Sequence, residues 1–421
     1  MKKLSEIVIF YISAALFSVS LQAEPVDAEY LYKSLKNRIY QIQVIDLASD
    51  KKSSIGSGFL ISKQGLIATN YHVISGVIHS PEKYRIEYLA HDGQKGELVL
   101  KDIDIVHDLA IVQGDISVAR ALSLATQSLF KGAHIYSLGN PHDLGMTIIE
   151  GTYNGLLEKS LYEKILFSGA LNPGMSGGPA LDNNGDVIGV NVSTAGNDLS
   201  FLVPVRYLSR LLSNLKDSAE PVNFTQRIEE QLFDNQSLYM QALMEKKWAS
   251  MVLGDVELPA ELDDYFKCWG KTDDNKEQLY IHTYSACSSP DSIYISSEFN
   301  TGTIDFRYDW FDAGKLNSLQ FYSRYSRQFA DSFSTNQGTK DDVSNYKCNT
   351  GFVSLHNKDW KVALCLRNYK NFKSLYDLSL TMAQVSEYDR GMIVNLNATG
   401  IAKDMLMKFA RQFMENIRWQ N

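Results

Sequence analysis

Between residues 39 and 205 the chain is dense in short runs of β-forming residues, which are separated by Gly, Asn and Asp. Short strands with turn signals at regular intervals predict an all-β barrel or sandwich. No cysteine falls within this stretch, so packing alone must stabilise it. The predicted strands are Ile39–Ile45, Gly58–Ile61, Leu66–Thr69, Tyr84–Leu89, Gly96–Ile105, His134–Leu138, Met146–Tyr153, Lys164–Phe167, Val187–Ser193 and Ser200–Val203.

The pattern changes after Val205. Apolar residues then recur at helical spacing, first over residues 207–215 and again over residues 228–248, and predict two helices. From about Gly254 onward, strand-like runs are mixed with a final helix near Lys403–Trp419, which predicts an α+β domain. The aromatic-rich stretch Tyr294–Trp310 could line a carbohydrate or peptide groove, but aromatics that alternate along a strand more often belong to a core.

The first 23 residues have the layout of a secretory signal. Lys2 and Lys3 precede an apolar run, Ile7 to Val19, and Ala23 stands just before Glu24. This order predicts cleavage after Ala23 and a periplasmic or secreted protein. The alternative is an uncleaved anchor, but the run is short for a bilayer, which needs about 20 apolar residues. We expect no membrane association once the signal is removed.

All four cysteines lie in the C-terminal part of the chain. An even number in an exported protein predicts two disulfides, with three possible connectivities, and pairing of sequence neighbours would close short loops. The alternative is buried free thiols. The cysteines are Cys268, Cys287, Cys348 and Cys365.

Neither a metal nor another cofactor is expected. The cysteines lack the close spacing of zinc modules, and His79, His91, His134 and His142 lack metal-ligand spacing. The net charge of −8 is not the strongly basic character of a nucleic-acid binder.

Three segments carry candidate chemistry. His72 lies just after the predicted strand Leu66–Thr69, Asp108 opens an apolar strand, and Ser176 lies among glycines in the segment 171–180. A serine hydroxyl becomes a nucleophile when a base removes its proton, and we expect His72 to be that base. Asp108 would hold the imidazole in the required tautomer, and Asp104 is its rival. The backbone N–H groups of Gly174 and Ser176 would form an oxyanion hole.

These motifs resemble the trypsin-like peptidases, and among them the HtrA (high-temperature-requirement) type. The matching motifs are Thr69-Asn70-Tyr71-His72, Asp108-Leu109-Ala110, Ser137-Leu138-Gly139-Asn140-Pro141, Gly174-Met175-Ser176-Gly177-Gly178 and Phe201-Leu202-Val203-Pro204. The resemblance covers about residues 55–206 and implies a chymotrypsin-like double β-barrel with His72, Asp108 and Ser176 in the cleft between the barrels. It also implies that proteins or peptides are the substrates.

The chain departs from the HtrA pattern in two ways. Met175 stands where these proteins commonly carry asparagine, and residues 254–421 contain no recognisable PDZ carboxylate-binding loop. We therefore divide the chain into a signal peptide (1–23), a trypsin-like protease domain (24–206), a helical linker (207–253) and an α+β C-terminal domain of unknown role (254–421). The oligomeric state is left open.

The resemblance also points to the residues of the S1 pocket, which holds the side chain before the cut. They are Ala170, Leu171, Val192 and Thr194, none of which is charged. A buried cationic side chain would lack a partner in this pocket, so we expect cleavage after small or medium apolar residues. The alternative function is a non-catalytic binding or scaffold protein of the cell envelope that keeps the protease-like barrel.

Overall fold

The computed structural model describes residues 27–117, 120–196, 198–217, 222–273, 279–331 and 338–420. The predicted signal peptide lies outside these residues. No helix in the described ranges is long and apolar enough to span a bilayer.

The first six strands close into an antiparallel barrel in the order β1-β2-β3-β6-β5-β4. Strands β1, β2 and β3 pack closely at Gly58 of β2. A Cβ on Gly58 of β2 would lie 2.8 Å from Ile67 of β3 and 2.9 Å from Ile42 of β1, so only glycine fits. The strands are β1 (Ile39–Asp46), β2 (Lys51–Leu60), β3 (Leu66–Thr69), β4 (Tyr84–Leu89), β5 (Lys95–Asp104) and β6 (Leu109–Gly114).

A second closed barrel follows, with the order β10-β11-β12-β9-β8-β7. The chymotrypsin-like double barrel predicted from the sequence is therefore confirmed. The strands are β7 (His134–Gly139), β8 (Thr147–Leu156), β9 (Ile165–Ser168), β10 (Pro179–Leu181), β11 (Val187–Gly196) and β12 (Leu199–Pro204).

One hydrophobic core is shared by the two barrels. Phe59 of the first barrel and Leu138 of the second are both fully buried in it. Helix α1 (Ala28–Leu35), capped by the Asp27 carboxylate, adds Leu31 and Leu35 to this core. Because the barrels pack through one apolar cluster, they are held in a fixed position relative to each other.

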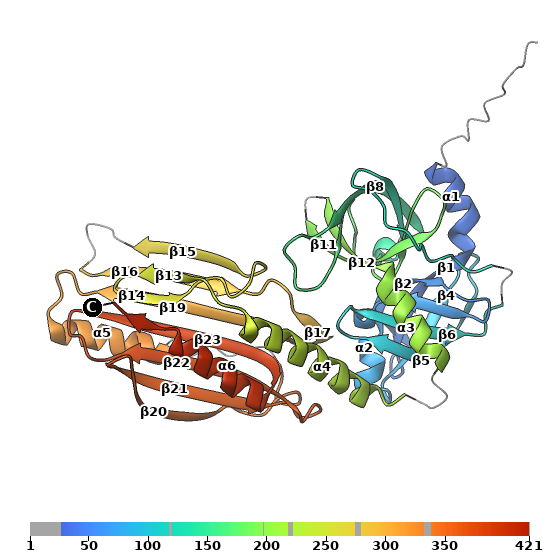
Figure 1. Cartoon of the computed structure of the whole chain (residues 1–421). Coiled ribbons are helices and arrows are strands. Elements are labelled where there is room, and N and C mark those ends of the chain that lie inside the picture. The colour runs from blue at the N-terminus through green and yellow to red at the C-terminus, as the bar shows by residue number, and fades with distance from the viewer. Residues whose placement is uncertain are drawn as a thin grey trace, which may run out of the picture.

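Two helices connect the barrels to the rest of the chain (Figure 1). Helix α3 (Val205–Asp217) packs Tyr207 and Leu208 on the shared barrel core. Helix α4 (Phe224–Glu245) places Ile228 on the first barrel and Met240 on the core of the C-terminal sheet. This helix therefore contacts both halves of the molecule.

The C-terminal part is built on a seven-stranded antiparallel sheet with the order β15-β16-β19-β23-β22-β21-β20. Side chains alternate between its faces, so Trp310 of β19 joins the core under α4 and α6, whereas Phe311 packs with α5. The elements are β15 (Lys267–Asp273), β16 (Ile281–Ser288), β19 (Ile304–Asp312), α5 (Ser318–Asp331), β20 (Lys347–Leu355), β21 (Lys358–Asn368), β22 (Leu375–Gln384), β23 (Arg390–Ala402) and α6 (Lys403–Glu415).

Two smaller sheets accompany it. One has the order β13-β14-β24, and the other is a hairpin of β17 and β18 that lies between the large sheet and the barrels (Figure 1). Their strands are β13 (Ser250–Leu253), β14 (Val256–Pro259), β17 (Ile293–Ser296), β18 (Phe299–Thr301) and β24 (Arg418–Trp419).

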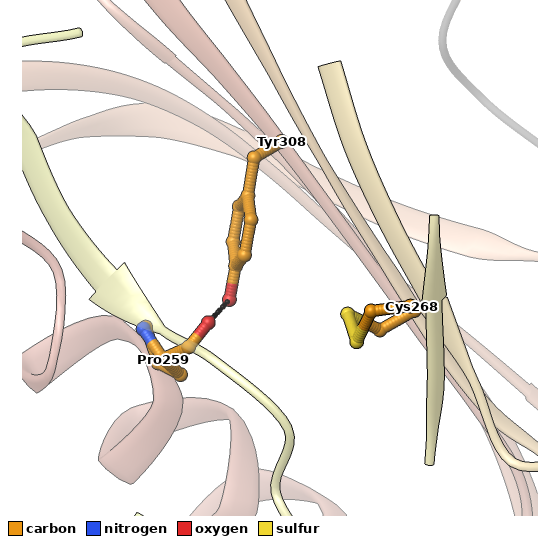
Figure 2. The surroundings of a disulfide bond; sticks show 4 residues. Pro259, Cys268 and Tyr308 are labelled. Atoms are coloured by element: carbon orange, nitrogen blue, oxygen red, sulfur yellow. Dashed lines mark hydrogen bonds between the residues drawn. A yellow bond between two sulfur atoms is a disulfide. The ribbon is translucent and has the colours of Figure 1, made fainter. Parts of the chain in front are cut away.

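The four cysteines form two disulfides between sequence neighbours. Cys268 joins Cys287 across β15 and β16, and Cys348 joins Cys365 across β20 and β21. Each pair is in register, with Cα atoms 4.0 Å apart. Beside the first disulfide, the buried Tyr308 hydroxyl donates to the Pro259 carbonyl at 2.8 Å (Figure 2).

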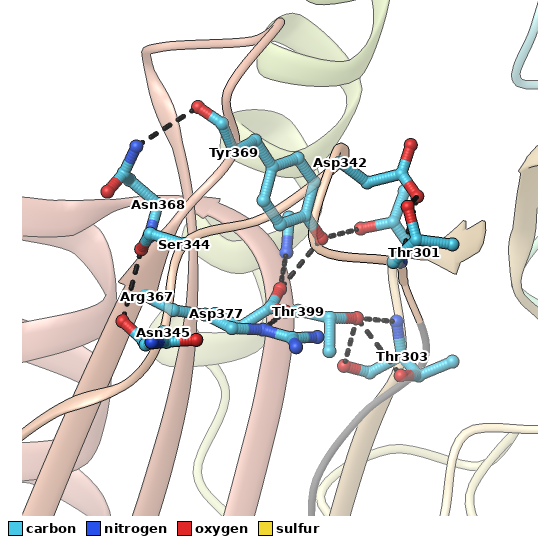
Figure 3. A network of polar contacts seen from close by, with 12 residues as sticks. Thr301, Thr303, Asp342, Ser344, Asn345, Arg367, Asn368, Tyr369, Asp377 and Thr399 are labelled. Atoms are coloured by element: carbon cyan, nitrogen blue, oxygen red, sulfur yellow. Dashed lines mark hydrogen bonds and ion pairs between the residues drawn. The ribbon is translucent and has the colours of Figure 1, made fainter. Parts of the chain in front are cut away.

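A buried polar network ties the hairpin to the large sheet (Figure 3). The Asp377 carboxylate accepts from Arg367 Nε at 2.7 Å, from the Tyr369 hydroxyl at 2.7 Å and from the Gly400 N–H at 3.0 Å. The Tyr369 hydroxyl also lies 2.6 Å from Thr301 Oγ1 of β18. These contacts offset the cost of burying the ion pair and give the hairpin a rigid base.

Candidate active site

His72 lies at the start of the helix that follows β3. Helix α2 (Tyr71–His79) begins directly after Asn70, so His72 lies in its first turn. Asn70 Nδ2 donates to the Asp108 carbonyl at 2.8 Å, and the Tyr71 N–H donates to the same oxygen at 3.3 Å. The start of the helix is therefore bound to the turn that carries Asp108.

Both carboxylate oxygens of Asp108 contact His72. Oδ2 lies 2.6 Å from His72 Nδ1, and Oδ1 accepts from the His72 backbone N–H at 2.8 Å. Asp108 has a left-handed backbone (φ 54°), which aspartate tolerates better than most residues. Burial alone would lower the pKa of His72, but the charge of Asp108 and its hydrogen bond outweigh burial and raise the pKa above its ordinary value of 6.5.

The rival carboxylate, Asp104, contacts a different histidine. Its Oδ2 lies 2.7 Å from His107 Nδ1, and its Oδ1 accepts from the His107 N–H at 3.0 Å. The His107 ring in turn stacks on Tyr207 with ring centres 3.6 Å apart. The structure brings Asp108, and not Asp104, to His72.

Ser176 comes from the second barrel, in the loop between β9 and β10. Its hydroxyl donates to the Val192 carbonyl at 3.1 Å, and its carbonyl accepts from the Ser57 N–H at 2.7 Å. A Cβ on Gly56 would lie 2.6 Å from Val73, the residue after His72, and 3.1 Å from the Ser176 carbonyl. The segments that carry His72 and Ser176 therefore both contact this glycine.

In the described part of the chain, the backbone N–H groups of Gly174 and Ser176 donate to no acceptor. The N–H groups of Met175, Gly177 and Gly178 all donate within the loop or to β11. Gly174 has φ 97°, and a Cβ there would lie 2.3 Å from the Asn140 carbonyl. The Met175 side chain is fully buried in the core of the second barrel.

The residues expected to form S1 lie near this loop. Leu171 is buried, and Ala170 and Val192 are half-buried. The side chain of Thr194 lies outside what the structure describes. Sequence reasoning missed Ser200, whose buried hydroxyl donates to the Gly169 carbonyl at 2.8 Å and accepts from the Leu171 N–H at 3.1 Å. Only its place in β12 could have drawn attention to it.

A residue of the C-terminal part also reaches His72. The Tyr294 ring of β17 packs edge-on to the imidazole, with ring centres 6.0 Å apart and planes at 72°. On the same strand, the Ile295 carbonyl accepts from the Tyr71 hydroxyl at 2.9 Å, although these residues are 224 positions apart in the sequence. No local sequence signal could have identified Tyr294 as a neighbour of His72.

A cavity of about 200 Å³ lies beside this contact. Segments from both barrels and from the hairpin form its walls. The lining residues are Ile105, Val106, His107, Asp108, Tyr162, Glu163, Lys164, Val192, Val203, Ser292, Ile293 and Tyr294.

Residues 56–190 match the family model of the trypsin-like peptidase domain. Human serine protease HTRA3 is 30% identical over 175 residues, which are 39% of this chain and 38% of the relative. A protein of Chlamydia trachomatis serovar D, described as a probable periplasmic serine endoprotease DegP-like, is 30% identical over 38% of this chain and 33% of its own length. The chain thus spans less than two fifths of the curated relatives it matches.

Over residues 56–190 the chain is thus similar to trypsin-like peptidase domains, and these two relatives are proteases of the HtrA and DegP-like types. Among solved structures, a serine endoprotease from Yersinia pestis is similar to 46% of this chain and to 68% of that chain, with 22% identity and a TM-score of 0.41.

Proposed function

We propose that this protein is a serine endopeptidase in which His72, Asp108 and Ser176 carry out peptide hydrolysis. The observation that carries the proposal is the two-point contact between Asp108 and His72, which orients the imidazole and raises its pKa. Asp104 makes the same two contacts with His107. The Asp108–His72 pair differs from it by its place, because Val73, the residue after His72, and the Ser176 carbonyl lie against the same glycine, Gly56.

The reaction follows from these contacts. The Ser176 hydroxyl leaves the Val192 carbonyl, turns to His72 Nε2 and attacks the substrate carbonyl while His72 takes its proton. His72 then gives this proton to the leaving amine, so the first half-reaction leaves an acyl-enzyme that water hydrolyses by the same route. Asp108 stabilises the imidazolium formed at each step, and the N–H groups of Gly174 and Ser176 donate to the developing oxyanion.

The proposed site of action is the periplasm or the exterior of the cell. Two disulfides in the C-terminal sheet suit an oxidising compartment, because cytosolic thiols are kept reduced. The relative from Chlamydia trachomatis is described as periplasmic.

The proposed specificity is for small or medium apolar residues before the cut. Ala170, Leu171 and Val192 are uncharged, and the buried hydroxyl of Ser200 beside them is already bonded on both sides. A charged side chain in this pocket would lose its hydration without gaining a partner. Discrimination among Val, Ala, Ile and Leu should be weak, because one methylene is worth only about 1–3 kcal/mol.

Digestion of an unfolded protein, with the products mapped by mass spectrometry, tests both the activity and the specificity. We expect Val, Ala, Ile or Leu before most cuts and no cuts with Ser176→Ala. Lys, Arg, Asp or Glu before most cuts would contradict the proposed pocket, and equal digestion by Ser176→Ala would contradict the proposed mechanism.

One observation favours the alternative of a non-catalytic binding protein built on the same barrels. The Ser176 hydroxyl donates to Val192, and no hydrogen bond joins it to His72 within the described residues. We favour the enzyme, because catalytic hydrogen bonds often form only when substrate is present. A wild-type protein that binds peptides and cleaves none of them would reverse this preference.

A further inference from the structure

The β17–β18 hairpin of the C-terminal part is anchored to the first barrel beside His72. The Ile295 carbonyl accepts from the Tyr71 hydroxyl at 2.9 Å and lies 2.9 Å from His79 Nε2. Tyr71 is fully buried and directly precedes His72. The position of β17 is therefore fixed relative to the helix that carries the proposed base.

A second anchor joins the segment before this hairpin to the second barrel. Asp291, nearly fully buried, accepts from Lys164 Nζ at 2.7 Å, from Ser160 Oγ at 3.0 Å and from the Leu161 N–H at 3.0 Å. These partners belong to the loop between β8 and β9. Residues 291–295 thus bridge the two barrels, and Tyr294 within them packs against His72.

Ser292, Ile293 and Tyr294 of this bridging segment line the cavity described above. Val192 lines it, and the same residue belongs to the proposed S1 wall and accepts the Ser176 hydroxyl through its carbonyl. Tyr294 lines the cavity and contacts the His72 ring, and Val106 of the first barrel also lines the cavity. Two residues that line the cavity, Val192 and Tyr294, therefore contact the proposed nucleophile and the proposed base, respectively.

We propose that this cavity binds the side chain of the substrate residue immediately before the cleaved one, and that Tyr294, supplied by the C-terminal part, determines which side chains fit. This inference rests on the proposed peptidase function. Successive side chains of an extended peptide point to opposite sides. Because the P2 side chain points away from the P1 side chain, we place it in the cavity beside Tyr294 and not against Ala170 and Leu171.

The charged groups around the cavity indicate that its occupant is apolar, because each of them already has a partner. A charged side chain entering the cavity would find no free counter-ion and would lose its hydration. Val106, Val192, Ile293 and the Tyr294 ring supply apolar surface. The existing pairs are Asp108 with His72, His107 with Asp104, Lys164 with Asp291, and Glu163 with Arg206 and the Tyr207 hydroxyl.

The test uses the full chain and a set of quenched peptides that differ only at P2, with Ala, Val, Leu or Phe at that position. The ratio of kcat/KM for Phe to that for Val is measured for wild type, Tyr294→Ala and Val106→Ala. Both substitutions enlarge the cavity, one in the C-terminal part and one in the first barrel. We expect each to raise this ratio about 10-fold or more, since a pocket discriminates methylene-sized differences by about 10–200-fold. Tyr388→Ala, an exposed tyrosine of the same C-terminal part (63% exposed), is the control and should leave the ratio unchanged.

Labelling with a fluorophosphonate is measured alongside for every protein, to show that each variant retains a folded site. If Tyr294→Ala fails to label, the ratio measured for Val106→Ala decides the outcome. An unchanged ratio in a variant that labels, or an equal loss of activity on all four peptides, would overturn the inference while leaving the peptidase function in place. A wild-type protein that neither labels nor cleaves would overturn the proposed function, and the inference with it.

Discussion

The Nδ1 atom of His72 lies 2.6 Å from the Oδ2 atom of Asp108, and the other oxygen of the same carboxylate accepts a hydrogen bond from the backbone N–H of His72. The His72 and Asp108 side chains keep 30% and 20% of their surface exposed, so the pair borders the cleft. One carboxylate therefore fixes the ring, its tautomer and the start of the helix that carries it.

Asp108→Asn should lower kcat by about 10⁴-fold while leaving the fold intact, because the amide would favour the wrong imidazole tautomer. Asp104→Asn is the matched control, since Asp104 makes the same pair of contacts with His107. Steady-state kinetics on one quenched peptide would compare the two. A large loss with Asp104→Asn and none with Asp108→Asn would show that the assignment is reversed.

The activity should rise with pH through a midpoint above 6.5. His72 acts as a base only when neutral, and its pKa is raised above that ordinary value by the charge and hydrogen bond of Asp108, which outweigh burial. In Asp108→Asn both raising effects are lost and burial remains, so the midpoint should move below 6.5. A profile of kcat/KM against pH measures both values, and a wild-type midpoint below 6.5 would contradict the described environment of His72.

Gly174→Ala should reduce kcat by about 100- to 1000-fold, because the added Cβ would force the backbone away from the Asn140 carbonyl and misplace an oxyanion donor. Gly132→Ala is the control. Gly132 also has a positive φ, 96°, but a Cβ there would have no atom within 4 Å. Alanine is strained at both positions because φ is positive in each. A kcat loss of the same size in both variants would therefore argue against a role for the Gly174 N–H.

Reduction of the disulfides should destabilise the C-terminal sheet and spare the barrels. The two bridges close segments of 19 and 17 residues, and each is expected to contribute about 3 kcal/mol. Thermal unfolding with and without reductant, followed separately by activity and by near-ultraviolet circular dichroism, would show which part is lost first. Four thiols alkylated without reduction in exported protein would contradict both bridges.

The double barrel could be predicted from the sequence because its signals are local. Strands alternate or are uniformly apolar, turns carry Gly, Asn or Asp, and the motifs around His72, Asp108 and Ser176 are short and ordered. The cysteine pairing stayed open, because it depends on the register of β15 with β16 and of β20 with β21, which only the folded sheet sets.

The positions of the aromatic residues in the stretch Tyr294–Trp310 could be predicted only in part from the sequence. Phe306, Tyr308 and Trp310 lie in the core of the large sheet, as alternating aromatics usually do, whereas Tyr294 belongs to a separate hairpin and lines the cavity beside His72. Tyr294 and the other three aromatic residues have different surroundings because β18 and the turn at Gly302 separate the hairpin from β19. Composition alone cannot distinguish them, since the contact with His72 is made by a distant part of the chain.

The most direct test of the central claim is to label the wild-type protein with a fluorophosphonate and locate the adduct by peptide mass mapping. Only a serine activated by a neighbouring base reacts readily with this probe. We predict a single adduct on Ser176, which is absent from Ser176→Ala and strongly reduced in His72→Ala. No adduct in folded wild-type protein, or an adduct on another serine that persists in Ser176→Ala, would contradict the account.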